Sequence, residues 1–189
     1  MKLNKKPWDK GIAKKMLTED KIAERVAELG AQITNDFKDK EGDIIVVCLL
    51  KGSIIFMADL CRKIKLPLKM DFMTVSSYGN EFISTREVKI KKDLDENIMG
   101  KHVIVIEDII DSGNTLKTVL KMLGHRGPKS VSLCTLLNKP SRREVEIDVQ
   151  YIGFEIEDEF VLGYGLDYMQ EYRNIPYVGI MGNLEELED

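Results

Sequence analysis

The sequence predicts an α/β protein with a mostly parallel β-sheet flanked by helices. Three segments rich in apolar residues support this class: residues 43–50 (DIIVVCLL), 102–108 (HVIVIED) and 130–139 (SVSLCTLLNK). Runs without polar alternation are typical of strands that are buried on both faces of a parallel sheet. Helical spacing of apolar residues between the runs completes the pattern, because strands that alternate with helices form parallel sheets.

The N-terminal half begins with a predicted helix behind Thr18, a residue type that caps helix N-termini. Apolar side chains then recur every three or four positions, as Ile22, Val26, Leu29, Ile33 and Phe37. The strand at 43–50 ends at Lys51-Gly52-Ser53. A second predicted helix, which should close before Pro67, carries Ile55, Phe56, Leu60 and Ile64. Residues 69–79 (KMDFMTVSSYG) are strand-like and run into a polar stretch, residues 76–87.

The C-terminal half continues the alternation. The strand at 102–108 is followed by a helix that Gly124 should stop and that carries Leu116, Val119, Leu120 and Leu123. The strand at 130–139 comes next, and residues 150–156 (QYIGFEI) and 177–182 (YVGIMG) are shorter strand candidates. We find no internal repeat or break in composition, so the expected organisation is a single domain over residues 1–189.

Composition excludes several classes of protein. The formal net charge of −4 gives no reason to expect nucleic-acid or membrane-surface binding. The longest apolar run, Ile44–Leu50, is far shorter than the roughly 20 residues of a membrane span, and no apolar stretch follows the basic N-terminus as in a secretory signal. Three cysteines without a CxxC pair predict buried, reduced thiols in a cytoplasmic protein. Two histidines make a zinc site improbable.

An acidic strand end is the main chemical motif. In residues 103–116 (VIVIEDIIDSGNTL), Glu107 and Asp108 follow a buried strand, and the turn Asp111–Thr115 opens the next helix. Ligands of parallel sheets bind at the carboxyl ends of strands, and helix-start amides with nearby hydroxyls can bind an anion such as phosphate. Carboxylates beside a phosphate would repel it unless a cation lay between them. Mg²⁺, which binds few carboxylates and otherwise water and substrate oxygens, fits that requirement.

The motif allows other interpretations. Asp111 or Ser112 could merely cap the helix while the acids are solvated, although three acids with a glycine turn behind a strand favour a binding site. The order of acids differs from an EF-hand loop, and the chain contains neither G-x-x-x-x-G-K-[ST] nor G-x-G-x-x-G.

The same fourteen residues resemble the signature of type I phosphoribosyltransferases, which use phosphoribosyl pyrophosphate (PRPP). Four further segments are similar to the hypoxanthine-guanine phosphoribosyltransferase family: residues 49–53 (LLKGS), 76–80 (SSYGN), 136–143 (LLNKPSRR) and 160–179 (FVLGYGLDYMQEYRNIPYVG). The resemblance covers residues 9–182, with the motifs in the right order. It implies a twisted sheet with a small hood formed from the chain ends, and a homodimer or homotetramer. It also implies purine salvage: Mg²⁺-dependent transfer of the 5-phosphoribosyl group from PRPP to hypoxanthine or guanine, giving IMP or GMP and pyrophosphate.

By this resemblance, the acidic motif binds the sugar phosphate. Glu107 and Asp108 lie on the ribose hydroxyls of PRPP, close to Mg²⁺. The 5′-phosphate is held by backbone amides and hydroxyls of the turn Asp111, Ser112, Gly113, Asn114 and Thr115. Asp111 also lies near N7 of the purine, where a carboxylate could act as general base and take the N7 proton.

The resemblance assigns the pyrophosphate contacts to Lys51, Gly52 and Arg173, and a guanidinium suits bidentate phosphate binding. It further implies a cis peptide between Leu50 and Lys51. Ser77 and Tyr78 begin a lid that would exclude water from the reacting centre.

The purine site is implied by four residues. The Lys139 ammonium would donate to O6 of the base, Phe160 would stack on the ring, and Val161 would offer backbone hydrogen bonds. Asp167 would bind a second Mg²⁺ through water, with its backbone carbonyl facing the 2-position of the base. Two rival functions fit less well: a nucleic-acid-binding regulator would need a basic face or an extension, and an aspartyl-phosphate phosphatase would need D-x-D where this chain has Asp108-x-x-Asp111.

Overall fold

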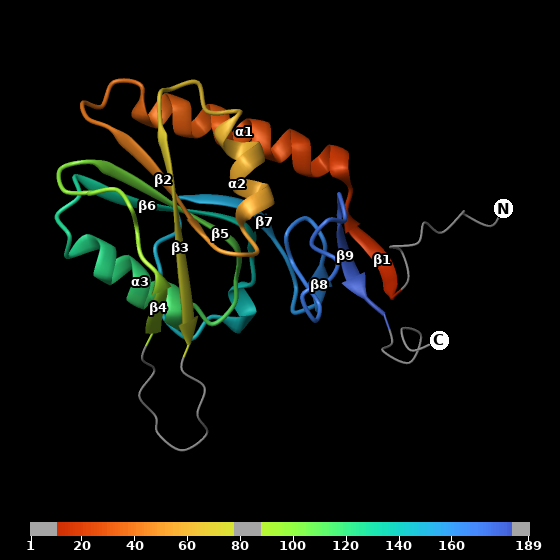
Figure 1. The fold of residues 1–189 in the computed structure, drawn as a ribbon. Helices are drawn as coiled ribbons and strands as arrows, with labels where there is room; N and C mark the ends of the chain where they lie inside the picture. Colours follow the sequence, from red (N-terminus) through yellow and green to blue (C-terminus); the bar gives the residue numbers. More distant parts are fainter. Residues whose placement is uncertain (1–10, 78–87, 183–189) are drawn as a thin grey trace, which may run out of the picture.

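The computed structural model describes residues 11–77 and 88–182 (Figure 1). A six-stranded sheet has the strand order β4-β3-β2-β5-β6-β7. Its strands are β2 (Ile44–Leu49), β3 (Lys69–Ser77), β4 (Val88–Lys92), β5 (His102–Ile110), β6 (Ser130–Asn138) and β7 (Tyr151–Glu155). All neighbouring pairs are parallel except β3 and β4, because the edge strand β4 runs antiparallel. The predicted α/β class with a mostly parallel sheet is confirmed.

Helices cover both faces of this sheet (Figure 1). Helices α1 (Glu19–Phe37) and α2 (Ile54–Cys61) pack on one face, and α3 (Asn114–Gly124) packs on the other. Strand β2 supplies both cores by alternation: Val46 and Cys48 join the cluster with α1 and α2, whereas Val47 joins the cluster with α3. A strand buried on both faces cannot alternate apolar and polar residues, which explains the unbroken apolar run.

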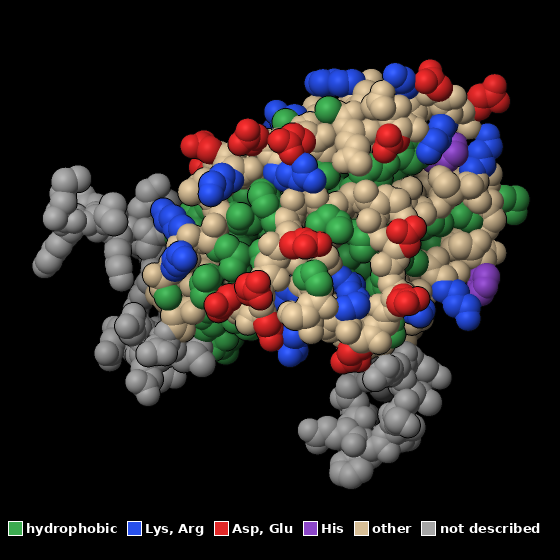
Figure 2. Space-filling view, turned by 180° about the vertical axis from the view of Figure 1, so that it is seen from behind, with side chains coloured by type: hydrophobic (Ala, Val, Ile, Leu, Met, Phe, Trp, Pro, Cys, Tyr) green, Lys and Arg blue, Asp and Glu red, His purple; other side chains and the backbone are tan. Residues whose placement is uncertain are grey.

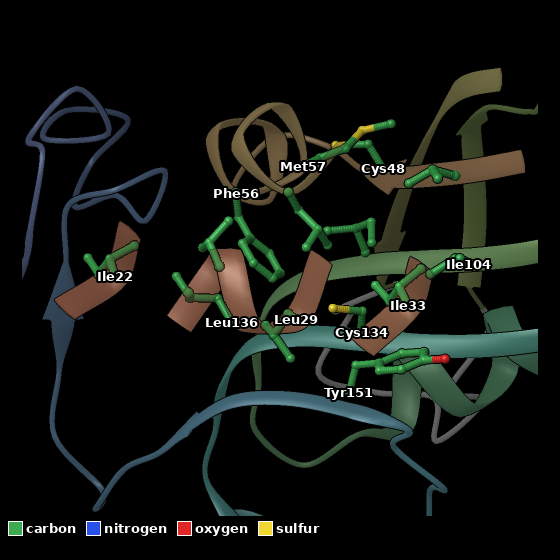
Figure 3. Close-up of a cluster of buried hydrophobic side chains, with 14 of the residues drawn as sticks. Ile22, Leu29, Ile33, Cys48, Phe56, Met57, Ile104, Cys134, Leu136 and Tyr151 are labelled. Atoms are coloured by element: carbon green, nitrogen blue, oxygen red, sulfur yellow. The ribbon is translucent and has the colours of Figure 1, made fainter. Parts of the chain in front are cut away.

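The larger core lies between the sheet and the helices α1 and α2 (Figure 3). Ile22, Leu29 and Ile33 of α1 lie in the same buried cluster as Phe56 of α2, as their spacing predicts. Cys48 and Cys134 are buried here, and burial raises the pKa of the Cys48 thiol to about 11. These two thiols are free and buried as predicted, whereas Cys61 is free and only partly buried.

A second, three-stranded antiparallel sheet lies beside the first and has the order β1-β9-β8 (Figure 1). It consists of β1 (Ile12–Leu17), β8 (Val161–Leu162) and β9 (Val178–Met181). Ile12 pairs with Met181, so the sheet joins the two ends of the described chain. The predicted hood is thus present.

Several element boundaries differ from the sequence prediction. Strand β5 continues through the acidic motif to Ile110, because Ile109 and Ile110 still pair with Leu137 and Asn138 of β6. Helix α2 ends at Cys61, although Ile64 beyond it is buried. Strands β1, β4 and β8 were not predicted as individual elements.

Acidic and basic side chains are interspersed on the molecular face seen in Figure 2, with apolar side chains between them. Within residues 11–77 and 88–182, no helix is both long enough and apolar enough to cross a membrane.

Candidate active site

A cavity of about 490 Å³ opens where β2 and β5 reach their carboxyl ends. Parallel sheets bind ligands at such edges. The cavity brings together most of the predicted site residues, namely Lys51, Gly52, Glu107, Asp108, Asp111, Ser112, Gly113, Thr115, Asp167 and Arg173. They come from three segments far apart in the chain: the β2–α2 loop, the end of β5 with its turn, and the loop after β8.

The turn between β5 and α3 depends on Gly113. Its φ of 83° lies in the left-handed region that favours glycine, and it occupies the N-cap position without a side-chain capping hydrogen bond. The alternative of a purely capping role has little support, since the capping-like contact from Asn114 N to Ser112 Oγ is 3.5 Å long. Asn114 does not line the cavity; its Nδ2 donates to Ser112 Oγ and, at 2.6 Å, to Glu144 Oε2.

Glu107 and Asp108 form a concentrated negative charge at the base of the cavity. Glu107 Oε2 is buried without a hydrogen-bond partner, and burial together with the Asp108 charge raises the pKa of Glu107 well above its usual value. Burial raises the pKa of Asp108 to about 6, although Ile109 N donates to Asp108 Oδ1 at 2.8 Å. A cation at this position would lower both pKa values by favouring the charged carboxylates.

This charge should cost the ligand-free protein stability at neutral pH. The pKa of Asp108 in the folded protein, about 6, lies above its ordinary value of 3.8. The folded state therefore binds a proton that the unfolded state lacks, and stability falls as the pH rises between these values. We expect Asp108→Asn to raise the free energy of unfolding at pH 8 by about 2–3 kcal/mol.

Urea unfolding at pH 8 and pH 5 measures this effect. The gain should shrink at pH 5, where Asp108 is largely protonated in the folded protein. Asp39→Asn, which neutralises an exposed carboxylate, is the matched control. Equal gains at both pH values would contradict the explanation.

A hydrogen-bonded network connects the predicted pyrophosphate contacts. Lys51 Nζ donates to Gln170 Oε1 at 3.0 Å, and Arg173 Nη2 donates to the same oxygen at 3.4 Å. Arg173 also forms a 2.7 Å ion pair with Asp167, whose Oδ2 accepts from Gln170 N at 2.9 Å. The Leu50–Lys51 peptide is cis, as the resemblance implies.

Glycines allow these segments to approach one another closely. A Cβ on Gly52 would come within 1.5 Å of Asp108 Oδ2. A Cβ on Gly165, which has a φ of 103°, would come within 2.0 Å of Gly52 O. The end of β5, the β2–α2 loop and the loop after β8 are therefore stacked without room for side chains.

Lys139 lies just after β6, with its ammonium between two carboxylates. It is only 7% exposed, and its Nζ is 3.5 Å from Asp111 Oδ1 and 3.6 Å from Asp158 Oδ1. Lys139 does not line the cavity, but Asp111 does. The predicted base-binding lysine and the predicted general base are thus direct neighbours.

The remaining predicted residues are located around this centre with less contact to it. Phe160 is 56% exposed, its ring meets Tyr168 edge to face at 6.1 Å, and Val161 is buried in β8. Neither lines the cavity. Of the predicted lid, Ser77 ends β3 and its backbone pairs with Val88, whereas Tyr78 lies outside the described residues.

Three residues of this region were missed by the sequence analysis. Gln170 bridges Lys51 and Arg173, Asp158 pairs with Lys139, and Arg143 packs against Gly113. The only sequence signal was their presence within or beside the segments 136–143 and 160–179, because their contacts are formed by the fold.

The acidic residues fit a magnesium ion that is completed by substrate. Within the two described ranges, no three His, Cys, Asp or Glu side chains converge to hold a metal by themselves. Mg²⁺ commonly binds one or two carboxylates and takes its other ligands from water and substrate phosphates. Glu107 with its unpartnered oxygen and Asp108 with its raised pKa have the chemistry for this, and the charge of Asp167 contributes to the raised pKa of Asp108.

Comparison with known proteins gives matches over most of the chain. The family described as "Phosphoribosyl transferase domain" matches residues 13–169. A hypoxanthine phosphoribosyltransferase of Salmonella typhimurium is 57% identical over 171 residues, which are 90% of this chain and 96% of that protein. The protein of the same name from Escherichia coli K12 has the same identity and coverage.

Solved structures agree in fold. A hypoxanthine phosphoribosyltransferase from Staphylococcus aureus superposes with a TM-score of 0.89 at 43% identity, covering 95% of this chain and 97% of that chain. A hypoxanthine-guanine phosphoribosyltransferase from Bacillus anthracis has a TM-score of 0.85 at 46% identity, covering 90% of this chain and 99% of that chain.

Proposed function

This chain belongs to the phosphoribosyltransferase family, and from that premise we propose that it transfers the 5-phosphoribosyl group of PRPP to hypoxanthine or guanine. The products are IMP or GMP and pyrophosphate. Residues 1–189 act as one phosphoribosyltransferase domain in purine salvage.

One observation carries the proposal: the cavity and the Lys139–Asp111 pair lie at the same strand ends. The Asp111–Thr115 turn offers an anion site for the 5′-phosphate. Lys51 and Arg173 supply cations for the pyrophosphate, and Lys139 supplies a donor for a 6-oxo group. An anionic sugar diphosphate and a 6-oxopurine together match this set of groups.

These positions support the following mechanism. Lys139 donates to O6 and orients the purine, with N7 toward Asp111. Asp111 accepts the N7 proton as N9 bonds to the ribose carbon, and the bond from that carbon to pyrophosphate breaks. Lys51 and Arg173 hold the departing pyrophosphate, and the lid that the resemblance assigns to the segment beginning at Ser77 would exclude water from the ribosyl cation-like transition state. Phe160 stacks on the base, and the Val161 backbone binds its edge.

Glu107, Asp108 and Asp167 would hold Mg²⁺. When bound, Mg²⁺ would neutralise the pyrophosphate and permit the approach of PRPP to the carboxylates. Glu107 and Asp108 themselves bind the ribose hydroxyls, which fixes the sugar relative to Asp111.

The test is the ultraviolet absorbance change on mixing protein, PRPP, magnesium and hypoxanthine. Guanine, xanthine and adenine are run in parallel, and each mixture without PRPP is the blank. Turnover of hypoxanthine and guanine is expected, and the absence of turnover with both would refute the proposal.

PRPP binding should require a divalent cation, because three carboxylates otherwise face the pyrophosphate. We expect calorimetric titration of PRPP to give no measurable binding in excess chelator, and binding to return when magnesium is added in excess. Binding of equal strength in chelator would contradict the roles of Glu107, Asp108 and Asp167.

Gln170→Glu should weaken the binding of pyrophosphate. The new carboxylate would occupy the position of an oxygen 3.0 Å from Lys51 Nζ and compete with pyrophosphate for both cations. We expect the KM for PRPP and the inhibition constant of pyrophosphate to rise by about tenfold, the effect of about 1.4 kcal/mol, while IMP affinity is unchanged. Asn174→Asp, which also adds one negative charge at an exposed position nearby, is the control. An equal loss of IMP affinity in Gln170→Glu would contradict the prediction.

We further propose a cytoplasmic location and a homodimer or homotetramer. Three free cysteines support a reducing compartment. The assembly is what the family resemblance implies, and sedimentation of the purified protein would test it.

A further inference from the structure

Arg143 has a partly desolvated guanidinium directly behind the predicted phosphate turn. It follows the short 3₁₀ turn Pro140–Arg142 after β6. Its Nη2 donates to Asn138 Oδ1, whereas its Nη1 is buried and has no hydrogen-bond partner. A buried donor without an acceptor costs free energy, so its retention calls for a compensating interaction.

The position of the guanidinium is set by Gly113. A Cβ at Gly113 would lie 3.1 Å from Arg143 Nη1, so the cation packs against the face of the turn that any other residue would fill. Arg143 does not line the cavity, whereas Gly113 does. The guanidinium and the cavity therefore contact the same turn, and Arg143 is not in position to touch a ligand directly.

The segment around Arg143 is fixed to the turn by its own hydrogen bonds. Glu144 N donates to Ser112 O at 3.0 Å, and Asn114 Nδ2 donates to Glu144 Oε2 at 2.6 Å. Two acidic side chains lie near this segment. Burial lowers the pKa of Arg143, and the negative charge of Asp111 opposes that lowering. The Glu144 carboxylate accepts a hydrogen bond from Asn114. Neither forms an ion pair with Arg143 within the described residues.

We propose that Arg143 is a positioning residue that supplies a full positive charge behind the Asp111–Thr115 turn and thereby binds the 5′-phosphate through the turn. Backbone amides alone provide only partial charges to an anion. A guanidinium remains protonated even when partly buried, and a phosphate monoester carries a charge of nearly −2 at neutral pH. The bound phosphate would be the counter-charge that Arg143 lacks in the ligand-free protein.

The inference rests on the proposed function, since it assumes that the turn binds a 5′-phosphate. IMP and inosine differ only by that phosphate, so their affinities separate the two ideas. Calorimetric dissociation constants are to be measured for the wild-type protein, Arg143→Met, Arg143→Lys and the control Arg126→Met. Arg126 lies beyond the other end of α3 and forms an ion pair with Asp93.

Arg143→Met is expected to weaken IMP binding by at least about tenfold and inosine binding by less than about twofold. At an effective dielectric constant of about 20, a unit charge several ångströms from a dianion changes its binding by more than tenfold. Inosine has no phosphate and should therefore be little affected. Arg143→Lys should retain most of the IMP affinity, and Arg126→Met should change neither. Thermal melts verify folding, and Arg143→Gln replaces Arg143→Met if the latter lacks a cooperative transition.

Equal losses for IMP and inosine, or unchanged IMP binding, would overturn the role of Arg143 while leaving the proposed function intact. A wild-type protein that binds inosine as tightly as IMP would instead refute the phosphate turn itself, and the inference with it.

Discussion

Asp111→Asn is expected to lower kcat by about 10²–10⁴-fold, the usual contribution of general acid–base catalysis. The amide keeps the size of the side chain but cannot accept the N7 proton. PRPP affinity should change much less, because Gly113 and the backbone of the turn remain. Steady-state kinetics with hypoxanthine, together with calorimetric titration of PRPP, measure both quantities.

Asp158→Asn is the matched control. Asp158 is 3.6 Å from Lys139 Nζ, and Asp111 is 3.5 Å from it, so either change removes one carboxylate from the lysine. Only Asp111 lines the cavity. Equal losses of kcat in the two variants would mean that Asp111 acts by holding Lys139 and not as a base.

Lys139→Gln should abolish most turnover of hypoxanthine and guanine while PRPP binding is kept. The ammonium has three donors and no acceptor, so a 6-oxo group can accept from it, whereas the amino group of adenine would meet a donor. Because Lys139 is buried, such a mismatch would leave two facing donors without an acceptor at that contact. Sites of this kind discriminate by about 10⁴–10⁵-fold in kcat/KM, and we expect the wild-type protein to reject adenine to that degree.

Lys101→Gln provides the comparison for this variant. Lys101 is also partly buried and paired, with Glu96 at 3.3 Å, but it precedes β5 at the end of the strand opposite the cavity. Its turnover should equal that of the wild type. If the wild-type protein used adenine as readily as hypoxanthine, the role assigned to Lys139 would be refuted.

The buried strands were predictable because their cause is local. Ile44–Leu49 is apolar and buried throughout, as expected of a strand that is covered on both faces. The end of β5 was predicted two residues too early, because the polar residues Glu107 and Asp108 marked a strand end, although Ile109 and Ile110 still pair with β6. Tertiary hydrogen bonding thus overrides the polarity that marks a strand end in the sequence.

The candidate site was predictable where a motif contains the whole feature, as in the Asp111–Thr115 turn. Gln170, Asp158 and Arg143 carry no such local signature. Gln170 contacts Lys51, Asp158 contacts Lys139, and Arg143 packs against Gly113. In each pair the two residues are far apart in the sequence, and only the fold brings them together. Strands β1 and β8 were missed for the same reason, because a short antiparallel strand is defined by its partner.

The pairing of β1 with β9 has a consequence for the order in which the protein is assembled during synthesis. Strand β1 leaves the ribosome first, but its partner Val178–Met181 follows only after the whole six-stranded sheet has been translated. Closing so long a loop costs entropy that nearby contacts do not, and nascent chains fold from the N-terminus onward. The parallel sheet with its acidic strand end can therefore form before the hood, which a growing chain can complete only after Met181 has been synthesised.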